Sequence, residues 1–240
     1  MRSMALARRN FLDIWRDPLY VSLTIGLPVF MLVVLQLLSG VDAYFTATSL
    51  AAGIVLFGFV MLMFSAAMAL SRDRESALFS RLLTAPLRPN DFVFAYSAPY
   101  IPVAILQAVA IFVVGLFFDL EVAGSILLVA LVLLTVAIMF IGLGMIVGML
   151  FSYKTVPFAY AAILILTIFG GAWMDLSAIG GPIETFASYL PFAHAIDATR
   201  DLMINGADFA TIATDYYWVL GYTVVTMILA VIVFRGRMVE

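Results

Sequence analysis

The stretch SILLVALVLLTVAIMFIGLGMIVGML, residues Ser125–Leu150, contains no charged residue and decides the fold class. A helix needs about 20 apolar residues to cross about 30 Å of hydrocarbon, and this stretch exceeds that length. Five other segments have the same apolar character: Leu19–Leu38, Leu50–Leu70, Phe92–Phe118, Pro157–Trp173 and Tyr216–Phe234. The sequence therefore predicts an all-α membrane protein with six transmembrane helices.

Composition excludes a soluble protein. Of the 240 residues, 65% are hydrophobic and only 11% are charged, which leaves too little polar surface to coat a soluble domain. Residues 1–240 are therefore predicted to form a single transmembrane domain. Cysteine is absent, which excludes disulfides and thiolate metal sites.

The twelve basic residues are distributed unevenly around the apolar segments. Eleven lie at the termini or in the second and fourth connections, and only Arg200 lies on the other side. Basic loops stay on the cytoplasmic side, so both termini are expected in the cytoplasm and the chain in a bacterial-type inner membrane. The net charge of −3 arises on the outer face, so nucleic acid is not an expected partner. The basic inner face suits anionic lipid or a partner subunit.

Residues 1–18 are predicted to form an amphipathic helix at the membrane interface. Its apolar face contains Met4, Ala7, Phe11, Ile14 and Trp15, and its polar face contains Arg2, Arg9, Asp13 and Arg16. An ordinary basic anchor before the first membrane helix is the alternative. The interfacial helix is preferred because both faces keep the helical period over about three turns.

The cytoplasmic connection 71–91 combines charge with an apolar face. Charged residues occupy positions 72–75, and prolines at 86 and 89 end the segment. Four apolar residues between them share one face of a short helix: Leu78, Phe79, Leu82 and Leu83. This face either lies against lipid and the base of the bundle, or docks into a groove of a cytoplasmic partner.

The outer connection 174–215 is too long for a turn and too apolar for a free loop, as the stretch 186–192 illustrates. We expect one or two short re-entrant helices in this segment, dipping partway into the outer leaflet before the last membrane helix. Irregular backbone at that depth must be covered by protein or line a cavity.

Motifs for catalysis are missing. There is no G-x-x-x-x-G-K-[ST] phosphate loop, no H-E-x-x-H pair and no G-x-S-x-G elbow, and His194 is the only histidine. The predicted membrane helices also lack mid-span ionisable residues, which a proton or ion relay would need. We therefore expect no catalytic residue, metal or cofactor on this chain, and an energy source outside it.

Gly144 and Gly148 form a G-x-x-x-G pattern, which permits close approach of a second helix. This pattern indicates either packing within the bundle or a dimer face.

Two stretches carry a family resemblance. The first runs Arg72-Asp73-Arg74-Glu75-Ser76, then Arg81-Leu82-Leu83 and Pro86; the second runs Leu190-Pro191, then Ala195, Asp197, Ala198 and Arg200. Together they resemble the "R-E-x-E … L-L-x-x-P" and "N-P-x-x-[YH]-x-x-[DE]-x-x-R" segments of ABC-2 type permeases, the membrane subunits of ATP-binding-cassette exporters. Ala77, Leu78, Ser80 and Phe192 depart from the family pattern, which bears on the subfamily and hence on the substrate.

The resemblance implies a half-transporter. Two permeases, identical or paralogous, would stand on two separate ATPase subunits that hold ATP and Mg²⁺. Coupling to the ATPase would fall to Arg74, Glu75, Leu78, Phe79, Arg81, Leu82 and Leu83, with Phe11 and Trp15 as a second contact. The outer lid would comprise Pro191, His194, Asp197 and Arg200.

A substrate path would form where the second and fifth membrane helices of two protomers meet. Its lining would include Met61, Met63, Phe64 and Phe169, which suit an apolar or amphipathic substrate such as a drug, lipid, glycan or peptide. The alternative is that these side chains face lipid.

Two other functions stay open beside an exporter. A lipid-modifying membrane enzyme would need clustered Asp/His or Ser/His groups at one membrane face, and the sequence shows none. A non-transporting scaffold or sensor subunit would share the fold and differ in its effect on an ATPase.

Overall fold

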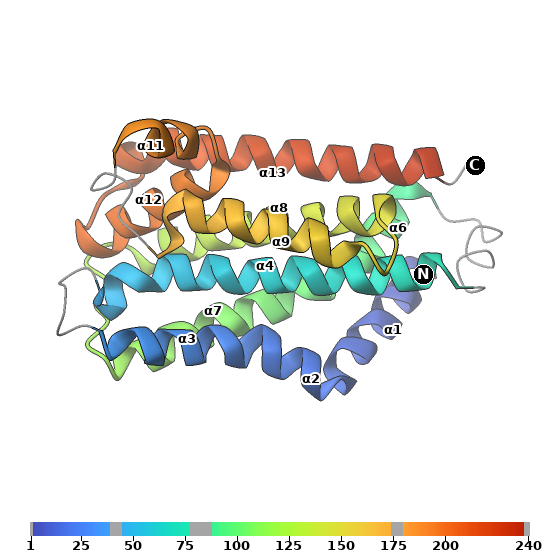
Figure 1. The fold of residues 1–240 in the computed structure, drawn as a ribbon, viewed down its shortest axis with the longest axis horizontal. Helices are drawn as coiled ribbons and strands as arrows, with labels where there is room; N and C mark the ends of the chain where they lie inside the picture. The colour runs from blue at the N-terminus through green and yellow to red at the C-terminus, as the bar shows by residue number, and fades with distance from the viewer. Residues whose placement is uncertain (1, 39–44, 77–87, 174–179, 238–240) are drawn as a thin grey trace.

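The computed structural model describes residues 2–38, 45–76, 88–173 and 180–237, and every regular element within these ranges is helical (Figure 1). The helices are α1 (Arg2–Arg16), α2 (Pro18–Val21), the π-helix η1 (Ser22–Gly26), α3 (Leu27–Gln36), α4 (Ala47–Arg74), α6 (Pro89–Ser97), α7 (Tyr100–Leu116), α8 (Ile126–Leu150), α9 (Val156–Thr167), the π-helix η3 (Ile168–Ala172), α11 (Gly181–Ala187), α12 (Pro191–Ile204) and α13 (Phe209–Arg237). The predicted all-α class is confirmed.

Five helical stretches are long and apolar enough to cross a membrane: Pro18–Gln36, Ala47–Arg74, Pro89–Leu116, Ile126–Leu150 and Phe209–Gly236. They cover five of the six predicted segments. The remaining segment forms the shorter apolar helix Val156–Ala172. Its last turn is a π-helix containing Gly171 at a φ of 89°, a conformation that favours glycine and ends the regular helix. A sixth crossing stays a prediction.

The α4 helix forms the centre of the bundle. In its most apolar window 72% of residues are buried, against 17% for Pro18–Gln36 and 28% for the last helix. It lies against α8 through the G-x-x-x-G pattern, since a Cβ added to Gly144 would lie 2.7 Å from the Met63 carbonyl oxygen. The same test places a Cβ on Gly148 at 2.8 Å from the Ala67 carbonyl oxygen. The pattern therefore serves packing within the bundle.

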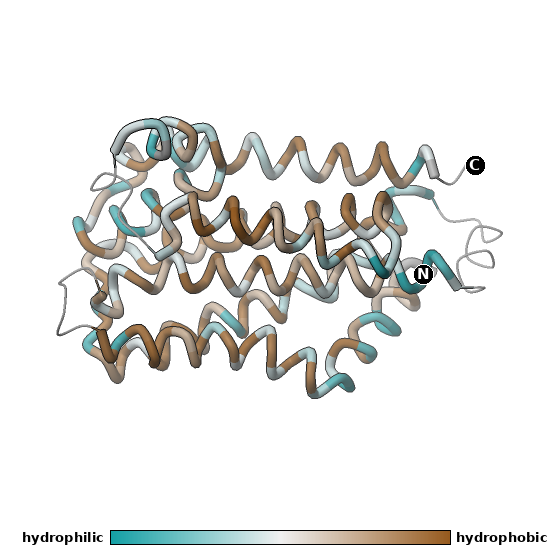
Figure 2. The backbone as a smooth tube through the Cα atoms, in the orientation of Figure 1, coloured by the Kyte–Doolittle hydropathy of each residue, from teal (hydrophilic) through white to brown (hydrophobic). Residues whose placement is uncertain are grey.

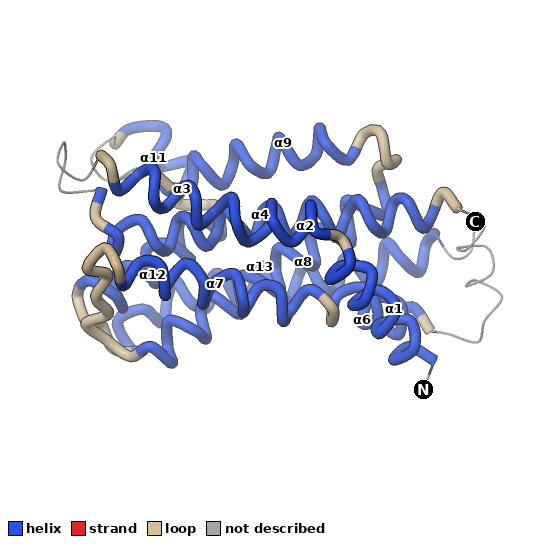
Figure 3. Tube along the Cα trace, turned by 90° about the horizontal axis from the view of Figure 1, so that it is seen from below, coloured by secondary structure: helices blue, strands red, loops and turns tan. Residues whose placement is uncertain are grey.

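The α1 helix crosses one end of the bundle at an angle to the long helices (Figures 1 and 3). The change of direction occurs at Asp17, whose backbone is extended and whose carboxylate accepts a hydrogen bond from Tyr20 N at 3.1 Å. The predicted apolar face of α1 is divided between two surroundings. Ala7 and Ile14 are buried against the protein, whereas Met4, Phe11 and Trp15 are exposed.

The segment predicted at 174–215 is shorter than expected, because α13 begins at Phe209 rather than near Tyr216. Asp208 starts the helix: its carboxylate accepts hydrogen bonds from Thr211 N at 3.0 Å and Thr211 Oγ1 at 2.8 Å. Before it, α11 and α12 confirm short helices in this segment, and their insertion into a leaflet stays a prediction.

Both chain termini lie at the same end of the bundle (Figure 1). We call this the basic end and the opposite one, where α11 and α12 lie, the acidic end. Figure 2 shows hydrophobic residues along the middle of the long helices and hydrophilic residues towards both ends. This pattern is that of an integral membrane protein.

Candidate coupling and gating sites

Asp73 joins three helices at the basic end. Near the C-terminus of α4, its Oδ2 accepts a hydrogen bond from Tyr96 Oη of α6 at 2.8 Å and pairs with the Arg9 guanidinium of α1. Next to Arg9, Asn10 Nδ2 donates to the carbonyl oxygen of Ala95 at 3.1 Å. We call Arg9, Asn10, Asp73 and Tyr96 the Asp73 cluster. It ties α1 and α6 to the end of α4.

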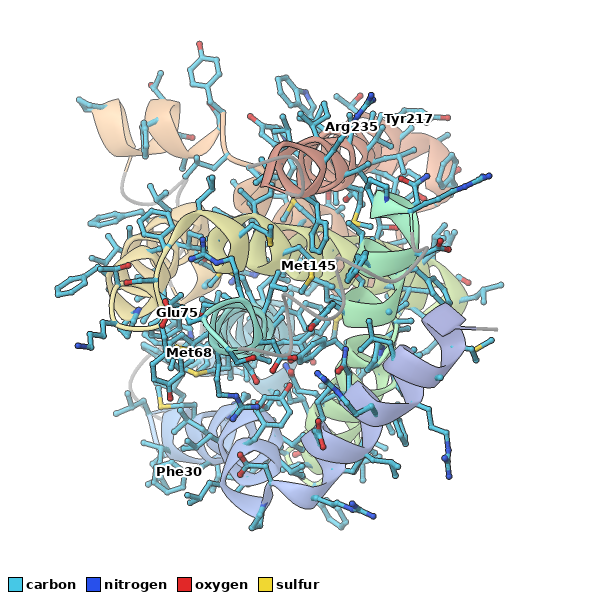
Figure 4. All side chains as sticks on the ribbon, turned by 90° about the vertical axis from the view of Figure 1, so that its right-hand side faces the viewer. Phe30, Met68, Glu75, Met145, Tyr217 and Arg235 are labelled. Carbon is cyan, nitrogen blue, oxygen red and sulfur yellow. The ribbon has the colours of Figure 1, made fainter. Side chains whose placement is uncertain are left out.

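The next two residues hold the connection between α8 and α9. Arg74 Nη2 donates to the Phe151 carbonyl oxygen at 2.7 Å, and Tyr153 N donates to Glu75 Oε1 at 2.8 Å. Figure 4 looks onto this end and shows Glu75 at the end of α4. The predicted coupling residues Arg74 and Glu75 therefore connect α4 to residues 151–153.

The other predicted coupling residues divide into two groups. Leu78, Phe79, Arg81, Leu82 and Leu83 lie outside the described residues. Phe11 and Trp15 lie on α1 with ring centroids 5.8 Å apart, and each is 37% exposed. The helix thus presents two aromatic rings on the side that does not pack on the bundle.

Arg200 joins three elements at the acidic end. From α12, its Nε donates to the Ser49 carbonyl oxygen at the start of α4 at 3.0 Å, and its Nη2 donates to the Gly171 carbonyl oxygen in η3 at 3.1 Å. The η3 backbone lies directly on α4, since a Cβ added to Gly53 would lie 1.6 Å from the Ala172 carbonyl oxygen. Arg200 therefore holds α12 against this junction.

His194 links α12 to α13 and to the end of α11. Its Nδ1 lies 2.7 Å from Asp215 Oδ1, its Nε2 lies 2.9 Å from the Ser188 carbonyl oxygen, and its ring stacks on Trp218. Both partners can only accept, so both bonds form only when both ring nitrogens carry hydrogen. The hydrogen bond to Asp215 raises the pKa of His194, against the opposing effect of partial burial. The geometry favours the imidazolium.

The two other predicted lid residues also lie on α12. Pro191 is buried at the first helical position, where a missing N–H costs nothing, and Asp197 is exposed. The structure therefore brings all four predicted lid residues onto one short helix, and two of them, Arg200 and His194, make side-chain hydrogen bonds to other elements.

The predicted path residues do not share one environment. Met61 and Phe64 on α4 face Tyr160 of α9, with 3.4 Å between Met61 Sδ and Tyr160 Oη and 4.6 Å between the ring centroids of Phe64 and Tyr160. Phe169 is 42% exposed, whereas Met63 is fully buried. The burial of Met63 gives its side chain a packing role in the chain's own core.

Several contributors to these sites were not identified from the sequence: Asn10, Asp73, Tyr96, Tyr153 and Asp215. In the sequence, Asp73 belongs to the charged run and to the first family-like stretch, without a predicted role of its own. The sequence contains one signal for the Arg9–Asp73 ion pair: the two residues have opposite charges and both lie on the predicted cytoplasmic side. Within the described ranges, no group of three or more His, Asp or Glu side chains is placed to hold a metal ion.

Comparison with known families identifies this architecture. The profile of the family described as "ABC-2 type transporter" matches residues 2–204. The chain belongs to the ABC-2 type transporter family. The match to this ABC-2 family extends from α1 through α12, so it contains both the Asp73 cluster and Arg200. ABC-2 membrane proteins are transport components.

A curated protein gives a weaker match to this ABC-2 chain. "ABC transporter G family member 20" of Dictyostelium discoideum is 22% identical over 138 residues. The match covers 56% of the chain and 19% of that protein. The ABC-2 chain therefore corresponds to a small part of the length of this relative.

Proposed function

We propose that this chain is the permease half of an ATP-driven exporter. Two permeases, identical or paralogous, would stand on two ABC-type ATPase subunits that hold ATP and Mg²⁺. The chain would cross a bacterial-type inner membrane six times with both termini in the cytoplasm, and would move an apolar or amphipathic substrate outwards.

The observation that carries this proposal is the set of contacts at the end of α4. The Asp73 cluster, Arg74 and Glu75 join α1, α6 and residues 151–153 to α4 immediately before residues 77–87. A force applied to that segment by an ATPase would reach the most buried helix of the bundle. Phe11 and Trp15 on α1 would provide the second contact.

Transport further requires that the ATPase bind two permease conformations with different affinity, because a partner with equal affinity for both shifts nothing. At the acidic end, Arg200 and His194 make contacts that can break when α12 moves. We assign these contacts to the closed state of the outer lid.

The path residues support the proposed substrate class. Met61, Phe64 and Phe169 present thioether and aromatic surface, which accommodates apolar groups of varied shape. A second protomer would complete this path, and Met63 would support it from inside the bundle.

Co-purification from the native membrane tests the proposal. We expect a stoichiometric ATPase subunit with a phosphate loop to accompany the wild-type chain, and its ATPase activity to fall in the L82D/L83D variant. Ile204→Asp is the matched control, because it places a carboxylate on an exposed apolar position at the acidic end. It should leave the ATPase bound and its rate unchanged.

Other outcomes separate the alternatives. Recovery of the chain without any ATPase, under conditions that preserve known complexes, would favour a lipid-modifying enzyme. An ATPase that binds and responds normally, with no substrate moved in reconstituted vesicles, would favour a scaffold or sensor subunit.

A further inference from the structure

A cavity of about 320 Å³ lies at the basic end, between the Pro18–Gln36 helix, α1, α4 and the start of the Pro89–Leu116 helix. Leu19 and Leu23 line it and are 74% and 56% exposed. Both belong to the Pro18–Gln36 helix, in which only 17% of the most apolar window is buried. The cavity therefore opens sideways, towards the hydrocarbon, rather than only towards the end of the bundle.

The charged groups of this cavity leave an excess of carboxylate. Its lining contains three carboxylates and two guanidinium groups: Asp13, Asp17, Asp73, Arg9 and Arg72. Arg9 is paired with Asp73 and lies 3.6 Å from Asp13. Asp13 and Asp17 are both exposed, at the mouth. The formal charge of the lining is therefore −1.

Aromatic and soft apolar groups line the rest of the cavity. Tyr20 and Tyr100 meet edge to face with centroids 6.3 Å apart, and Phe64 and Met68 lie on the α4 wall. The Tyr20 hydroxyl is buried beside the hydroxyl side chains of Thr24 and Ser65, which also line the cavity.

We propose that this cavity binds an amphiphile with an ammonium head group and an apolar tail. The ammonium would lie between the carboxylates of Asp13 and Asp17 and the tyrosine rings, whose faces attract cations. The tail would follow Leu23, Phe64 and Met68 towards the hydrocarbon. The excess of carboxylate would repel an anionic head group. An uncharged head group would displace water from the carboxylates without an ion pair in return, which is unfavourable.

The cavity thus gives the exported substrate a class, and its role as the first binding step rests on the proposed permease function. Met61 and Phe64 line both this cavity and the predicted path. Two sources supply the same chemistry: an aminophospholipid of the surrounding leaflet, or a lipophilic amine from the cytoplasm.

The test is binding of radiolabelled dodecylammonium to the purified chain in uncharged maltoside micelles, measured by equilibrium dialysis. The variant D13N/D17N changes the lining from −1 to +1, and asparagine at position 17 still caps α2. Its matched control is D119N/E121Q, which removes two carboxylates at the acidic end. Micelles take up the probe equally for all chains, so differences between chains report the site.

We expect D13N/D17N to bind dodecylammonium about tenfold more weakly than wild type, with the control unchanged. The affinity for dodecyl sulfate or dodecanol should not be lower in D13N/D17N than in wild type. The proposal would be overturned if wild type and D13N/D17N bound dodecylammonium with equal affinity. It would also be overturned if wild type bound dodecyl sulfate as tightly as dodecylammonium.

Displacement of the labelled dodecylammonium by an unlabelled lipid identifies the source of the natural ligand. Phosphatidylethanolamine that displaces the label supports the site with a membrane lipid as its ligand, and failure to displace supports it with a lipophilic amine. The assay contains no ATPase. Its failure would leave the coupling proposal intact, and failure of co-purification would leave a positive binding result intact.

Discussion

At the basic end, polar contacts from several elements converge on the last turn of α4, whereas at the acidic end they spread outwards from one short helix. Asp73 holds α1 and α6, and Arg74 and Glu75 together hold residues 151–153. By contrast, Arg200 and His194 of α12 together reach α4, η3, α13 and residue 188. In α12, Arg200 and His194 supply these side-chain contacts, and the carbonyl oxygens of Leu202 and Met203 accept from Gly124 N and Ala123 N. A part that transmits force and a part that opens would differ in this way.

Among the variants that test this difference, Arg200→Ala has the largest expected effect on stability. The change leaves two backbone carbonyls without their charged donor, and we expect the free energy of unfolding to fall by about 3 kcal/mol. Thermal unfolding in detergent measures it. Arg235→Ala, at an exposed arginine on α13, should change little. Equal losses for the two variants would show that α12 does not depend on Arg200.

The next test compares two partners of Arg9. Asp73→Asn weakens the contacts to Arg9 and Tyr96 at a site with 14% side-chain exposure, and should cost about 2 kcal/mol. Asp13→Asn removes an ion pair from a side chain that is 55% exposed, and should cost less than about 0.5 kcal/mol. If the order of the two were reversed, the cluster would not centre on Asp73. Coupled ATPase activity should follow the same order.

Sequence alone predicted the helices because apolar length and charge placement are local properties. The start of α13 was placed too late, because the polar first turn after Asp208 looks like a loop unless its capping bonds are known. The division of the α1 apolar face could not be foreseen, since it depends on where α6 lies.

The sites show the same limit. Arg200 and His194 were identified from the resemblance, but their acceptors at Ser49, Gly171 and Ser188 are backbone carbonyls, which have no sequence signature. Met63 was grouped with Met61 and Phe64 by sequence proximity. A helix turns by about 100° per residue, so neighbouring residues face different surroundings, and Met63 turned out to be buried.

A third prediction concerns pH at the acidic end. The pKa of His194 is raised in the folded protein, so its stabilising contribution is fully present below the unfolded value of about 6.5 and is lost as the pH rises through the folded value. Wild type should lose about 1 kcal/mol relative to His194→Gln between about pH 6 and pH 9. Unfolding of both chains across this range measures the difference. Parallel curves would mean that the imidazolium is not the folded form.

The smallest expected effect also belongs to the acidic end. Tyr222 Oη donates to the Tyr189 carbonyl oxygen at 2.8 Å in exposed surroundings, so Tyr222→Phe should cost only about 0.5 kcal/mol. That loss is close to the resolution of a melting curve. Hydrogen exchange is the better measurement, because the bond fixes the chain just after α11, and amides at 181–190 should exchange faster in the variant.

Tyr217→Phe is the matched control for Tyr222→Phe, since Tyr217 lies on the same helix and is 59% exposed. Its loss should leave exchange at 181–190 as in wild type. Equal acceleration by both variants would mean that α11 responds to any change on α13. The acidic end would then respond as a unit, and the contrast between a spreading and a converging set of contacts would disappear.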